Sequence, residues 1–510
     1  MSCLAGKIYD EACEDSIHGL DATEAPAPVR TKAACGELNE GFDLTSLDFS
    51  CCCQLLEFFF HKFLVIPRVT TLSLPTLNEV NGQKPREIAA RILGKRQFSD
   101  EYTETLLDRA LANARLSPAD RGLTVELVFG VIRWLETLDW LIARKTQGRT
   151  QKPGLQDLLR LGLYQIFWLD RIPDHAAVHE TVEQAKRDGF GSQAGFVNAV
   201  LRGYIREKDE TRATLAELKT SQPALGYSHP EWLVTRWQKQ FGAERTRQLL
   251  ESNNTPPKIF ARINTLRTDA TKLIEAWREE NVDYDFVTWD WAGENLSFEL
   301  KSHPPLTTLE SFCNGWFYIQ DPSTLLAVRE LDPHPGETIL DLCAAPGGKS
   351  TYVAQLMNNQ GRIVAHDNVP DRLKLIEENC QRLGVTCAEI TSTLDPRPST
   401  FDRILVDAPC SNTGVLRRRV DLRWRIQPEE IERLRSTQLD LLQKAAARLK
   451  PGGVLIYSTC SLEPEENTAL VQQFLATQPN LKLERERQLL PFTDGTDGAF
   501  VARLINQLIK

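Results

Sequence analysis

Two cysteines of the 510-residue chain follow short apolar runs in a pattern that suits covalent chemistry. Cys410 ends the run LVDAPC (405–410), and Cys460 ends the run YSTC (457–460). A thiolate is the reactive form of cysteine and forms covalent intermediates with electrophilic carbon. When a thiolate adds to C6 of a pyrimidine, C5 becomes nucleophilic, and a carboxyl group such as that of Asp407 stabilises the charge that develops on the ring. A second thiol would then assist release of the product.

The alternative interpretation is that these cysteines are structural, because free cysteine is often buried. That interpretation fits Cys343, Cys380 and Cys387. It fits the pair less well, because each of the two directly follows a strand-like run, at 403–406 and at 453–458. If those runs are parallel neighbours, their carboxyl ends lie at one edge of a sheet, where such sheets bind ligands. The pattern therefore predicts that the two thiols meet.

A turn rich in small residues precedes both cysteines. The segment DLCAAPGGKS (341–350) follows a strand-like run at 338–342 and opens a helical pattern. Small residues let the backbone approach a ligand closely, and a helix N-terminus favours negative groups. The segment matches neither the dinucleotide fingerprint nor the P-loop, and a tight strand-to-helix turn is the alternative. After the next strand-like run, Asp367 is placed to accept a hydrogen bond from a ribose hydroxyl or to cap the following helix.

The pattern of apolar residues along the chain predicts the strands and helices that position these residues. Strand-like runs alternate with helical patterns throughout residues 331–510, which predicts a parallel, doubly wound α/β sheet. Residues 209–330 combine helices with strand-like runs, which predicts a linker and a small α+β unit. Residues 85–208 show helical periodicity alone, which predicts an all-α bundle. Residues 1–84 have no periodic pattern and stay unassigned as an extension.

Net charge and composition indicate which binding partners to expect among a nucleic acid, a metal ion and a membrane. The net charge is −9, but residues 1–84 hold 12 Asp/Glu against 6 Lys/Arg, so most of the excess lies in the extension. A nearly neutral remainder does not exclude a nucleic acid. The 12 cysteines include no C-x-x-C pair, so we expect no metal site and a reducing, cytoplasmic environment. No apolar stretch is long enough to cross a bilayer, so no membrane is expected as a partner.

Three segments resemble the diagnostic motifs of RNA 5-methylcytosine methyltransferases. They are LDLCAAPGGKS (340–350), VDAPCSNTGVLRRRVDLRW (406–424) and YSTCSLEPEEN (457–467). In addition, LVFGVIRWLETLDWLI (127–142) and FVNAVLRGYIRE (196–207) resemble the NusB-like domain that precedes the catalytic domain in bacterial members acting on small-subunit ribosomal RNA. The resemblance covers about residues 85–510. It implies a NusB-like helical RNA-binding domain at 85–208 and a Rossmann-like class I methyltransferase domain at 331–510.

The resemblance also implies residue roles. Cys460 would be the nucleophile that attacks C6, Cys410 would help to release the product, and Asp407 would contact the target base and lie near the cofactor. In the family an acidic residue usually follows the third strand, but here Ser392 stands at that position and brings a hydroxyl without charge. S-adenosylmethionine would be held by Ser392, Asp407 and the residues Cys343, Ala344, Ala345, Pro346, Gly347, Gly348, Lys349 and Asp367.

A basic run follows Cys410 directly. Clusters of arginine neutralise phosphate, and tryptophan stacks on unpaired bases, so this run is a candidate RNA contact. The alternative for a charge run is an ordinary solvated face. The candidate residues are Arg417, Arg418, Arg419, Arg423, Trp424 and Arg425.

The expected function is methylation of C5 of one cytosine in small-subunit (16S) ribosomal RNA before the subunit is fully assembled. We expect the enzyme to act as a monomer. Two alternatives remain open. One is the same chemistry on tRNA or another ribosomal RNA, and the other is a catalytically weak RNA-binding protein that keeps the fold without the turnover.

Overall fold

The computed structural model of the protein describes residues 84–293, 296–394 and 401–507. The predicted extension at 1–84, apart from Lys84, lies outside these residues. All described residues belong to one of the two units into which the chain divides.

The first described domain is helical, as predicted. Its apolar stripes face inward: Leu127, Val128 and Val131 of one helix and Leu158 and Leu159 of another are almost fully buried in a shared core. No strand occurs among residues 84–206, so the helical domain is confirmed. Its helices are α2 (Pro85–Arg96), α3 (Thr103–Ala112), α4 (Pro118–Arg133), α5 (Leu135–Thr146), α6 (Pro153–Trp168), α7 (Asp174–Arg187), the 3₁₀ turn η2 (Gly191–Gln193) and α8 (Ala194–Arg206).

Further helices connect this domain to the sheets. Leu233, Val234 and Trp237 of the third connector helix are buried with Leu249 and Leu250 of the fourth. The connectors are α9 (Lys208–Ser221), α10 (Pro223–Tyr227), α11 (Glu231–Phe241) and α12 (Ala243–Asn254).

The small α+β unit contains a four-stranded antiparallel sheet in the order β2-β3-β1-β4. Trp277 is fully buried, with its ring 5.2 Å from Phe298 and 5.3 Å from Phe317. The sequence predicted three of these strands but not β4, because three residues are too short to show an alternating pattern. The elements are β1 (Ile259–Ile263), α13 (Ala270–Glu279), β2 (Asp283–Val287), β3 (Ser297–Ser302), η3 (Leu306–Thr308), α14 (Glu310–Cys313) and β4 (Phe317–Ile319).

The C-terminal domain is built on a seven-stranded sheet in the order β10-β11-β9-β8-β5-β6-β7. The five strands from β9 to β7 are parallel, whereas β11 and β10 are antiparallel additions. The Rossmann-like class is therefore confirmed, but the prediction of a wholly parallel sheet was wrong. Its strands are β5 (Thr338–Asp341), β6 (Arg362–His366), β7 (Ala388–Thr391), β8 (Phe401–Asp407), β9 (Leu449–Thr459), β10 (Leu481–Leu489) and β11 (Ala499–Asn506).

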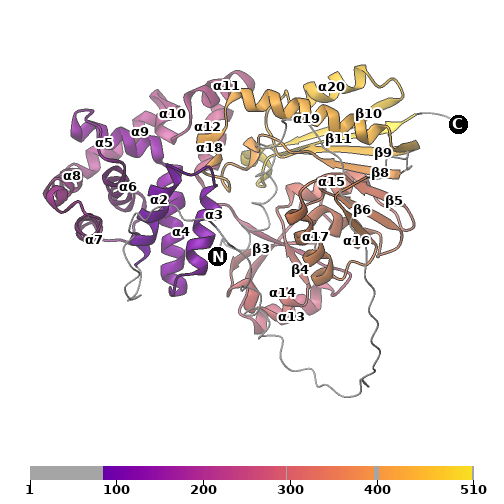
Figure 1. The fold of residues 1–510 in the computed structure, drawn as a ribbon, viewed down its shortest axis with the longest axis horizontal. Helices are drawn as coiled ribbons and strands as arrows, with labels where there is room; N and C mark the ends of the chain where they lie inside the picture. Colours follow the sequence, from indigo (N-terminus) through magenta and orange to yellow (C-terminus); the bar gives the residue numbers. More distant parts are fainter. Residues whose placement is uncertain (1–83, 294–295, 395–400, 508–510) are drawn as a thin grey trace, which may run out of the picture. The chain divides into compact units, whose positions relative to one another are not determined.

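Helices cover both faces of this sheet (Figure 1). Ile339 and Leu405 face one layer, while the adjacent Leu340 and Ile404 face the other, as side-chain alternation along a strand requires. On the first face lie α15 (Ser323–Leu331), α16 (Gly348–Leu356) and α17 (Pro370–Leu383). On the second face lie α19 (Pro428–Ala446) and α20 (Thr468–Ala476). Short elements in the connections are η4 (Thr413–Val415), α18 (Leu422–Arg425) and α21 (Pro491–Asp494).

The loop that follows the fourth parallel strand packs against the helical domain. Asp421 is fully buried at this joint. Its carboxylate accepts a hydrogen bond at 2.5 Å from Arg96, one at 2.9 Å from Arg425, and one at 3.2 Å from the backbone N–H of Thr103. A buried carboxylate is stable only when paired in this way, so Asp421 ties α2 and α3 to the catalytic domain.

We expect Asp421→Asn to lower the free energy of unfolding by about 2 kcal/mol, because it leaves two arginines at a buried joint without their anion. Asp440→Asn is the matched control: Asp440 forms an exposed helical pair with Lys444, and its loss should cost less than about 0.5 kcal/mol. Thermal unfolding of both variants measures the difference, and equal midpoints would contradict the assigned role of Asp421.

Candidate active site

The structure brings the two cysteines together. Strands β8 and β9 are parallel neighbours in which Asp407 pairs with Ser458, so both chains leave the sheet at the same edge. Beyond that edge the Sγ atoms of Cys410 and Cys460 lie 3.4 Å apart. Strand topology therefore places two thiols in contact, although 50 residues separate them in the sequence.

A buried glutamate holds the two cysteine turns. The carboxylate of Glu466, which has no exposed surface, accepts hydrogen bonds from the Ser411 backbone N–H at 2.9 Å and from the Ser461 hydroxyl at 2.5 Å. Gln438 of α19 donates a third at 2.9 Å, and the Ser411 hydroxyl donates a fourth. Burial raises the pKa of Glu466, while these donors act in the opposite direction. Since Ser411 follows Cys410 and Ser461 follows Cys460, one carboxylate fixes both turns.

Asn412 is a second side chain, besides Cys410, that touches the thiol of Cys460. The thiol donates to Oδ1 of Asn412 at 2.8 Å, and Nδ2 of Asn412 donates to the carbonyl of Cys410 at 2.7 Å. Sequence reasoning missed both Asn412 and Glu466. The only available signal was their place inside the two cysteine motifs, since hydrogen bonds between separate turns leave no periodic pattern.

Asp407 and Lys349 connect the thiols to the glycine turn. Nζ of Lys349 lies 2.5 Å from one carboxylate oxygen of Asp407, and the Ser458 hydroxyl donates to the other at 2.7 Å. Burial alone would lower the pKa of Lys349, but the facing Asp407 carboxylate outweighs burial and raises it. Lys349 therefore stays a cation in a half-buried position, between the predicted cofactor turn and the cysteines.

A cavity of about 510 Å³ lies along this edge of the sheet. This volume is in the range of small-molecule sites. Gly347 adopts φ = 98°, a left-handed conformation that begins α16, and an added Cβ would lie 3.3 Å from Ile376. The turn thus needs glycine there. Of the predicted cofactor and catalytic residues, the cavity is lined by Cys343, Ala344, Ala345, Pro346, Gly348, Lys349, Asp367, Asp407, Cys410 and Cys460.

Asp341, at the end of β5, is an unpredicted member of this cavity. Its Oδ2 accepts a hydrogen bond from Ser350 at 2.6 Å, but among the described residues its buried Oδ1 has no partner. Burial raises the pKa of Asp341 to about 7. An unpaired oxygen in a cavity wall fits a polar ligand, which supports the predicted site.

Burial likewise raises the pKa of the Cys343 thiol, which favours a lining role over a reactive one.

Asp367 serves the fold as well as the cavity. Its carboxylate accepts hydrogen bonds from the backbone N–H of Ala345 at 3.3 Å and of Val369 at 3.2 Å, and pairs with Arg372 at 3.4 Å. It is almost fully buried yet lines the cavity. The helix that follows has Val369 as its N-cap and no side-chain cap, so the capping alternative was wrong, and the ribose contact stays a prediction. Ser392 differs from the prediction: it is exposed and not among the lining residues, whereas Leu394 lines the cavity.

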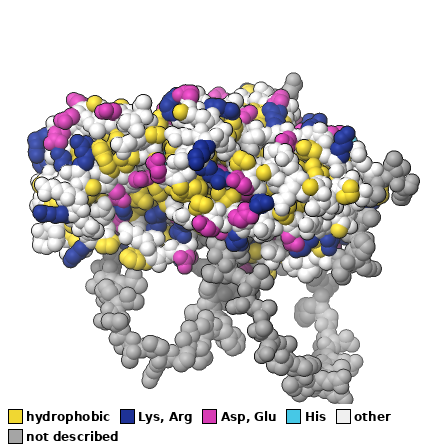
Figure 2. Space-filling view, turned by 90° about the horizontal axis from the view of Figure 1, so that it is seen from above, with side chains coloured by type: hydrophobic (Ala, Val, Ile, Leu, Met, Phe, Trp, Pro, Cys, Tyr) yellow, Lys and Arg dark blue, Asp and Glu magenta, His cyan; other side chains and the backbone are white. Residues whose placement is uncertain are grey.

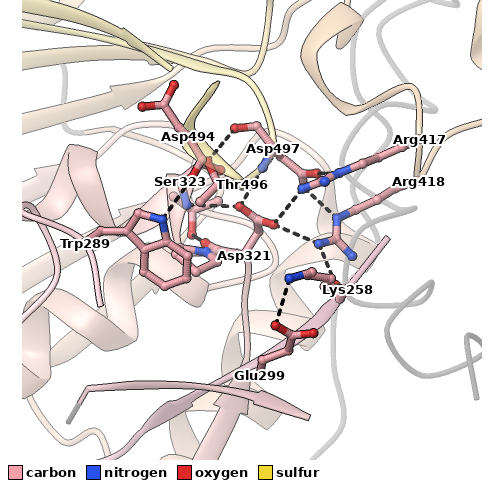
Figure 3. A network of polar contacts seen from close by, with 12 residues as sticks. Lys258, Trp289, Glu299, Asp321, Ser323, Arg417, Arg418, Asp494, Thr496 and Asp497 are labelled. Atoms are coloured by element: carbon pink, nitrogen blue, oxygen red, sulfur yellow. Dashed lines mark hydrogen bonds and ion pairs between the residues drawn. The ribbon is translucent and has the colours of Figure 1, made fainter. Parts of the chain in front are cut away.

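Most of the basic run after Cys410 is bound within the protein, which corrects the expectation that it faces RNA. Figure 3 shows Arg417 and Arg418 between the carboxylates of Asp321 and Asp497. Arg417 donates to Asp497 at 2.6 Å, and Arg418 donates to Asp497 at 2.5 Å and to Asp321 at 2.8 Å. The two acids neutralise the two cations, so this pair is a structural link between the loop, the start of α15 and the β10–β11 connection.

The second half of the run belongs to the joint with the helical domain. Arg423 is fully buried, and in the described chain its hydrogen bonds go to uncharged acceptors, among them Oδ1 of Asn254 at 2.9 Å. Trp424 donates to the carbonyl of Ile132 at 2.9 Å. Arg425 donates to Asp421 and to backbone carbonyls before α3. These placements do not fit phosphate contacts or base stacking.

Arg419 is the member of the run that lines the cavity. Its guanidinium lies 5.9 Å from the ring centre of Tyr102, and only 8% of the residue is exposed. On the face that Figure 2 shows, Lys and Arg side chains lie among Asp and Glu side chains. That mixture matches the small net charge of the chain after residue 84.

The described ranges contain neither a membrane-spanning helix nor a cluster of metal ligands. No helix there has the length and apolarity required to traverse a bilayer. Within the same ranges, no cluster of three or more His, Cys, Asp or Glu residues is arranged to hold a metal ion.

Comparisons with known proteins agree with the domain order. Residues 328–505 match the family described as 16S rRNA methyltransferase RsmB/F, residues 83–206 match the NusB family, and residues 229–290 match the ferredoxin-like domain of RsmF/B-like methyltransferases. The sheet and its glycine turn thus belong to an S-adenosylmethionine-dependent methyltransferase. The structure also resembles the crystal structure of PH0851, with a TM-score of 0.67 and 25% identity, over 85% of this chain and all of that one.

Curated relatives extend over most of the chain. The probable ribosomal RNA small subunit methyltransferase B of Bacillus subtilis is 36% identical over 444 residues, which are 82% of this chain and 98% of the relative. The corresponding protein of Klebsiella pneumoniae is 36% identical over 410 residues, which are 77% of this chain and 92% of the relative. The chain therefore belongs to the ribosomal RNA small subunit methyltransferase B family.

The buried carboxyl of Asp341 predicts a pH-dependent stability. Its pKa is raised from 3.8 to about 7, so between these values the folded protein keeps a proton that the unfolded chain loses. The stability from this group is full below pH 3.8 and is lost as the pH rises to about 7. Asp341→Asn mimics the protonated form, so over this range the wild type should lose stability relative to the variant. Thermal unfolding across the range measures this, and parallel profiles would contradict the assignment.

Proposed function

We propose that this protein methylates C5 of a specific cytosine in small-subunit ribosomal RNA through a covalent intermediate on cysteine. The observation that carries the proposal is the contact of the two sulfur atoms, 3.4 Å apart, in the wall of the cavity that also contains the glycine turn. A methyltransferase that acts on an oxygen or nitrogen nucleophile has no need for paired thiols. The carbon C5 of cytosine is a poor nucleophile and needs covalent activation.

Cys460 is the proposed nucleophile. Its thiolate forms a bond to C6 of the cytosine, and the electron pair of the C5–C6 double bond makes C5 nucleophilic. When bound, S-adenosylmethionine would supply an electrophilic methyl group on its sulfonium sulfur, which becomes a neutral thioether as C5 takes up the methyl. A base then takes the C5 proton, the C5–H electron pair restores the double bond, and the Cys460 sulfur leaves C6 as a thiolate. Cys410, whose sulfur contacts that of Cys460, is placed to act as this base and so to assist release.

Asp407 and Lys349 form the proposed polar wall for the base. Next to N3 and N4 of cytosine, the Asp407 carboxylate can accept from the N4 amino group, while the Lys349 ammonium offsets the negative charge that develops on the ring when sulfur adds to C6. The Ser458 hydroxyl and the Lys349 ammonium hold the Asp407 carboxylate from two sides, which keeps it oriented before the base arrives. Such preorganisation is the main source of electrostatic catalysis.

The residues around the turn fit S-adenosylmethionine. The cavity offers the unpaired Oδ1 of Asp341, the carboxylate of Asp367, and a backbone turn that glycine keeps open. We propose that Asp367 accepts from the ribose of the cofactor and that the turn at 343–349 contacts its methionine part. Ser392 is not needed for this arrangement, because it lies outside the cavity wall.

The relatives named above as small-subunit methyltransferases support ribosomal RNA as the substrate. The helical domain, which matches the NusB family, is the proposed site of a second RNA contact. Arg423 and Trp424 of the loop contribute to this indirectly, because they donate to the backbone of that domain and so hold it against the loop of Cys410. We also propose that the enzyme acts in the cytoplasm, as a monomer without a metal.

We expect Cys460→Ser to reduce methyl transfer by roughly 10³-fold or more, because a hydroxyl cannot replace the thiolate nucleophile. The measurement is transfer of labelled methyl groups from S-adenosylmethionine to unmodified small-subunit RNA. Cys313→Ser is the control, since Cys313 is exposed and lies outside the cavity, and it should keep wild-type activity. Near-normal transfer by Cys460→Ser would refute covalent catalysis by this residue.

We expect Cys410→Ala to trap a covalent protein–RNA adduct, because the nucleophile still attacks while release is slowed. Denaturing electrophoresis with labelled RNA detects the adduct, and the double variant lacking both thiols should form none. An adduct that accumulates with Cys460→Ser instead would reverse the roles of the two cysteines.

A further inference from the structure

We propose that Asn412 is a further catalytic residue, whose side-chain amide accepts the thiol proton of Cys460 in a hydrogen bond and thereby controls the position and reactivity of that sulfur. The inference rests on the proposed function, in which Cys460 is the nucleophile. The motif comparison gave Asn412 no role, and the structure places it against a reacting atom.

The amide is oriented by two contacts. Its Oδ1 faces the Cys460 sulfur at 2.8 Å, and its Nδ2 donates to the Cys410 carbonyl oxygen at 2.7 Å. A carbonyl oxygen only accepts hydrogen bonds, so a flipped amide would place two acceptors together. The contact with Cys410 therefore directs the acceptor end of Asn412 toward the thiol of Cys460. One side chain thus joins the backbone of one cysteine to the sulfur of the other.

The backbone conformation holds Asn412 close to the turn that carries Cys460. Asn412 has φ = 56°, a left-handed conformation that asparagine tolerates better than most residues. Two residues later, the Gly414 N–H donates to the Cys460 carbonyl at 2.9 Å. An added Cβ at Gly414 would lie 2.7 Å from that carbonyl oxygen, so the two segments are in close contact. Asn412 consequently has a fixed distance to the sulfur, set by main-chain contacts.

The contact has a chemical consequence. An oxygen that accepts from S–H stabilises the thiol, whereas a thiolate in the same place would face the negative end of the amide dipole. On the other side, the Lys349 ammonium interacts electrostatically with Cys460. The Cys460 sulfur therefore lies between the amide of Asn412 and a cation. The hydrogen bond to Asn412 holds the thiol in one orientation.

Two substitutions separate this role from a structural one. Asn412→Asp places a charge beside the sulfur, so alkylation of Cys460 by iodoacetamide should slow roughly tenfold, because a nearby anion disfavours the thiolate. Asn412→Gly removes the amide but suits φ = 56°, so alkylation should become several-fold faster. With Asn412→Gly, kcat for methyl transfer should fall about tenfold with an unchanged KM for S-adenosylmethionine, because a mispositioned nucleophile lowers the chemical step.

The matched control is Asn281→Gly. Asn281 has nearly the same backbone angle, φ = 57°, but is exposed at the end of α13 and outside the cavity. It should change neither the alkylation rate nor kcat. Alkylation sites are assigned by mass spectrometry of the full-length protein, with the buried Cys380 as an internal monitor of unfolding.

The outcomes distinguish the hypotheses. Slower alkylation in Asn412→Asp cannot result from unfolding, which would expose Cys460, so it supports the amide–thiol contact. An unchanged Cys460 alkylation rate in both variants, or faster alkylation of Cys460 and Cys380 together, would overturn the proposal. A normal kcat in Asn412→Gly would overturn the catalytic role. Failure of the wild type to methylate RNA would refute the proposed function alone, and the alkylation rates would still decide whether Asn412 controls this sulfur.

Discussion

The carboxylate of Glu466 is the interaction on which the geometry of the site depends. Two parallel strands bring their ends to one edge of a sheet, but strand pairing stops at Asp407 and Ser458, before either cysteine. Beyond that point only single main-chain bonds join the two segments, such as that from the Gly414 N–H to the Cys460 carbonyl. Glu466 adds the side-chain link by accepting from residues that directly follow Cys410 and Cys460. A buried carboxylate needs several donors to be stable, so the network is formed completely or is costly. The contact between the two thiols is therefore a consequence of a third side chain that performs no chemistry.

The arginines after Cys410 pair within the protein, whereas the sequence predicted that they contact RNA. Arg417 and Arg418 bind the carboxylates of Asp321 and Asp497, and Arg423 is enclosed by acceptors from the helical region. The loop that carries one thiol is thus attached to three separate parts of the chain. Buried hydrogen bonds thus join this loop to the domain that matches the NusB family. Arg419, which remains at the cavity, is the member of the run best placed to contact a ligand.

The sequence predicted those features that follow from periodicity and strand order, and it failed where a feature depends on contacts between distant turns. Alternating strands and helices predicted the Rossmann-like domain, and the carboxyl ends of two strands predicted that Cys410 and Cys460 meet. The edge strand β10 was missed because its exposed side chains are charged and hide the alternation. A run of arginines has the same composition whether it faces phosphate or buried aspartates, so the acids that pair with Arg417 and Arg418 could be found only in the structure. For the same reason Asn412 had no signal of its own: its role depends on a sulfur 48 residues away.

The proposed function assigns the paired thiols at this sheet edge to C5 methylation of a cytosine in small-subunit RNA. Mapping 5-methylcytosine in RNA from cells with the protein, without it, and with Cys460→Ser in its place tests this assignment. We expect one cytosine of the small-subunit RNA to carry a C5 methyl group only when the intact protein is present. An unchanged map of the small-subunit RNA, or a methyl group lost from another RNA instead, would contradict it.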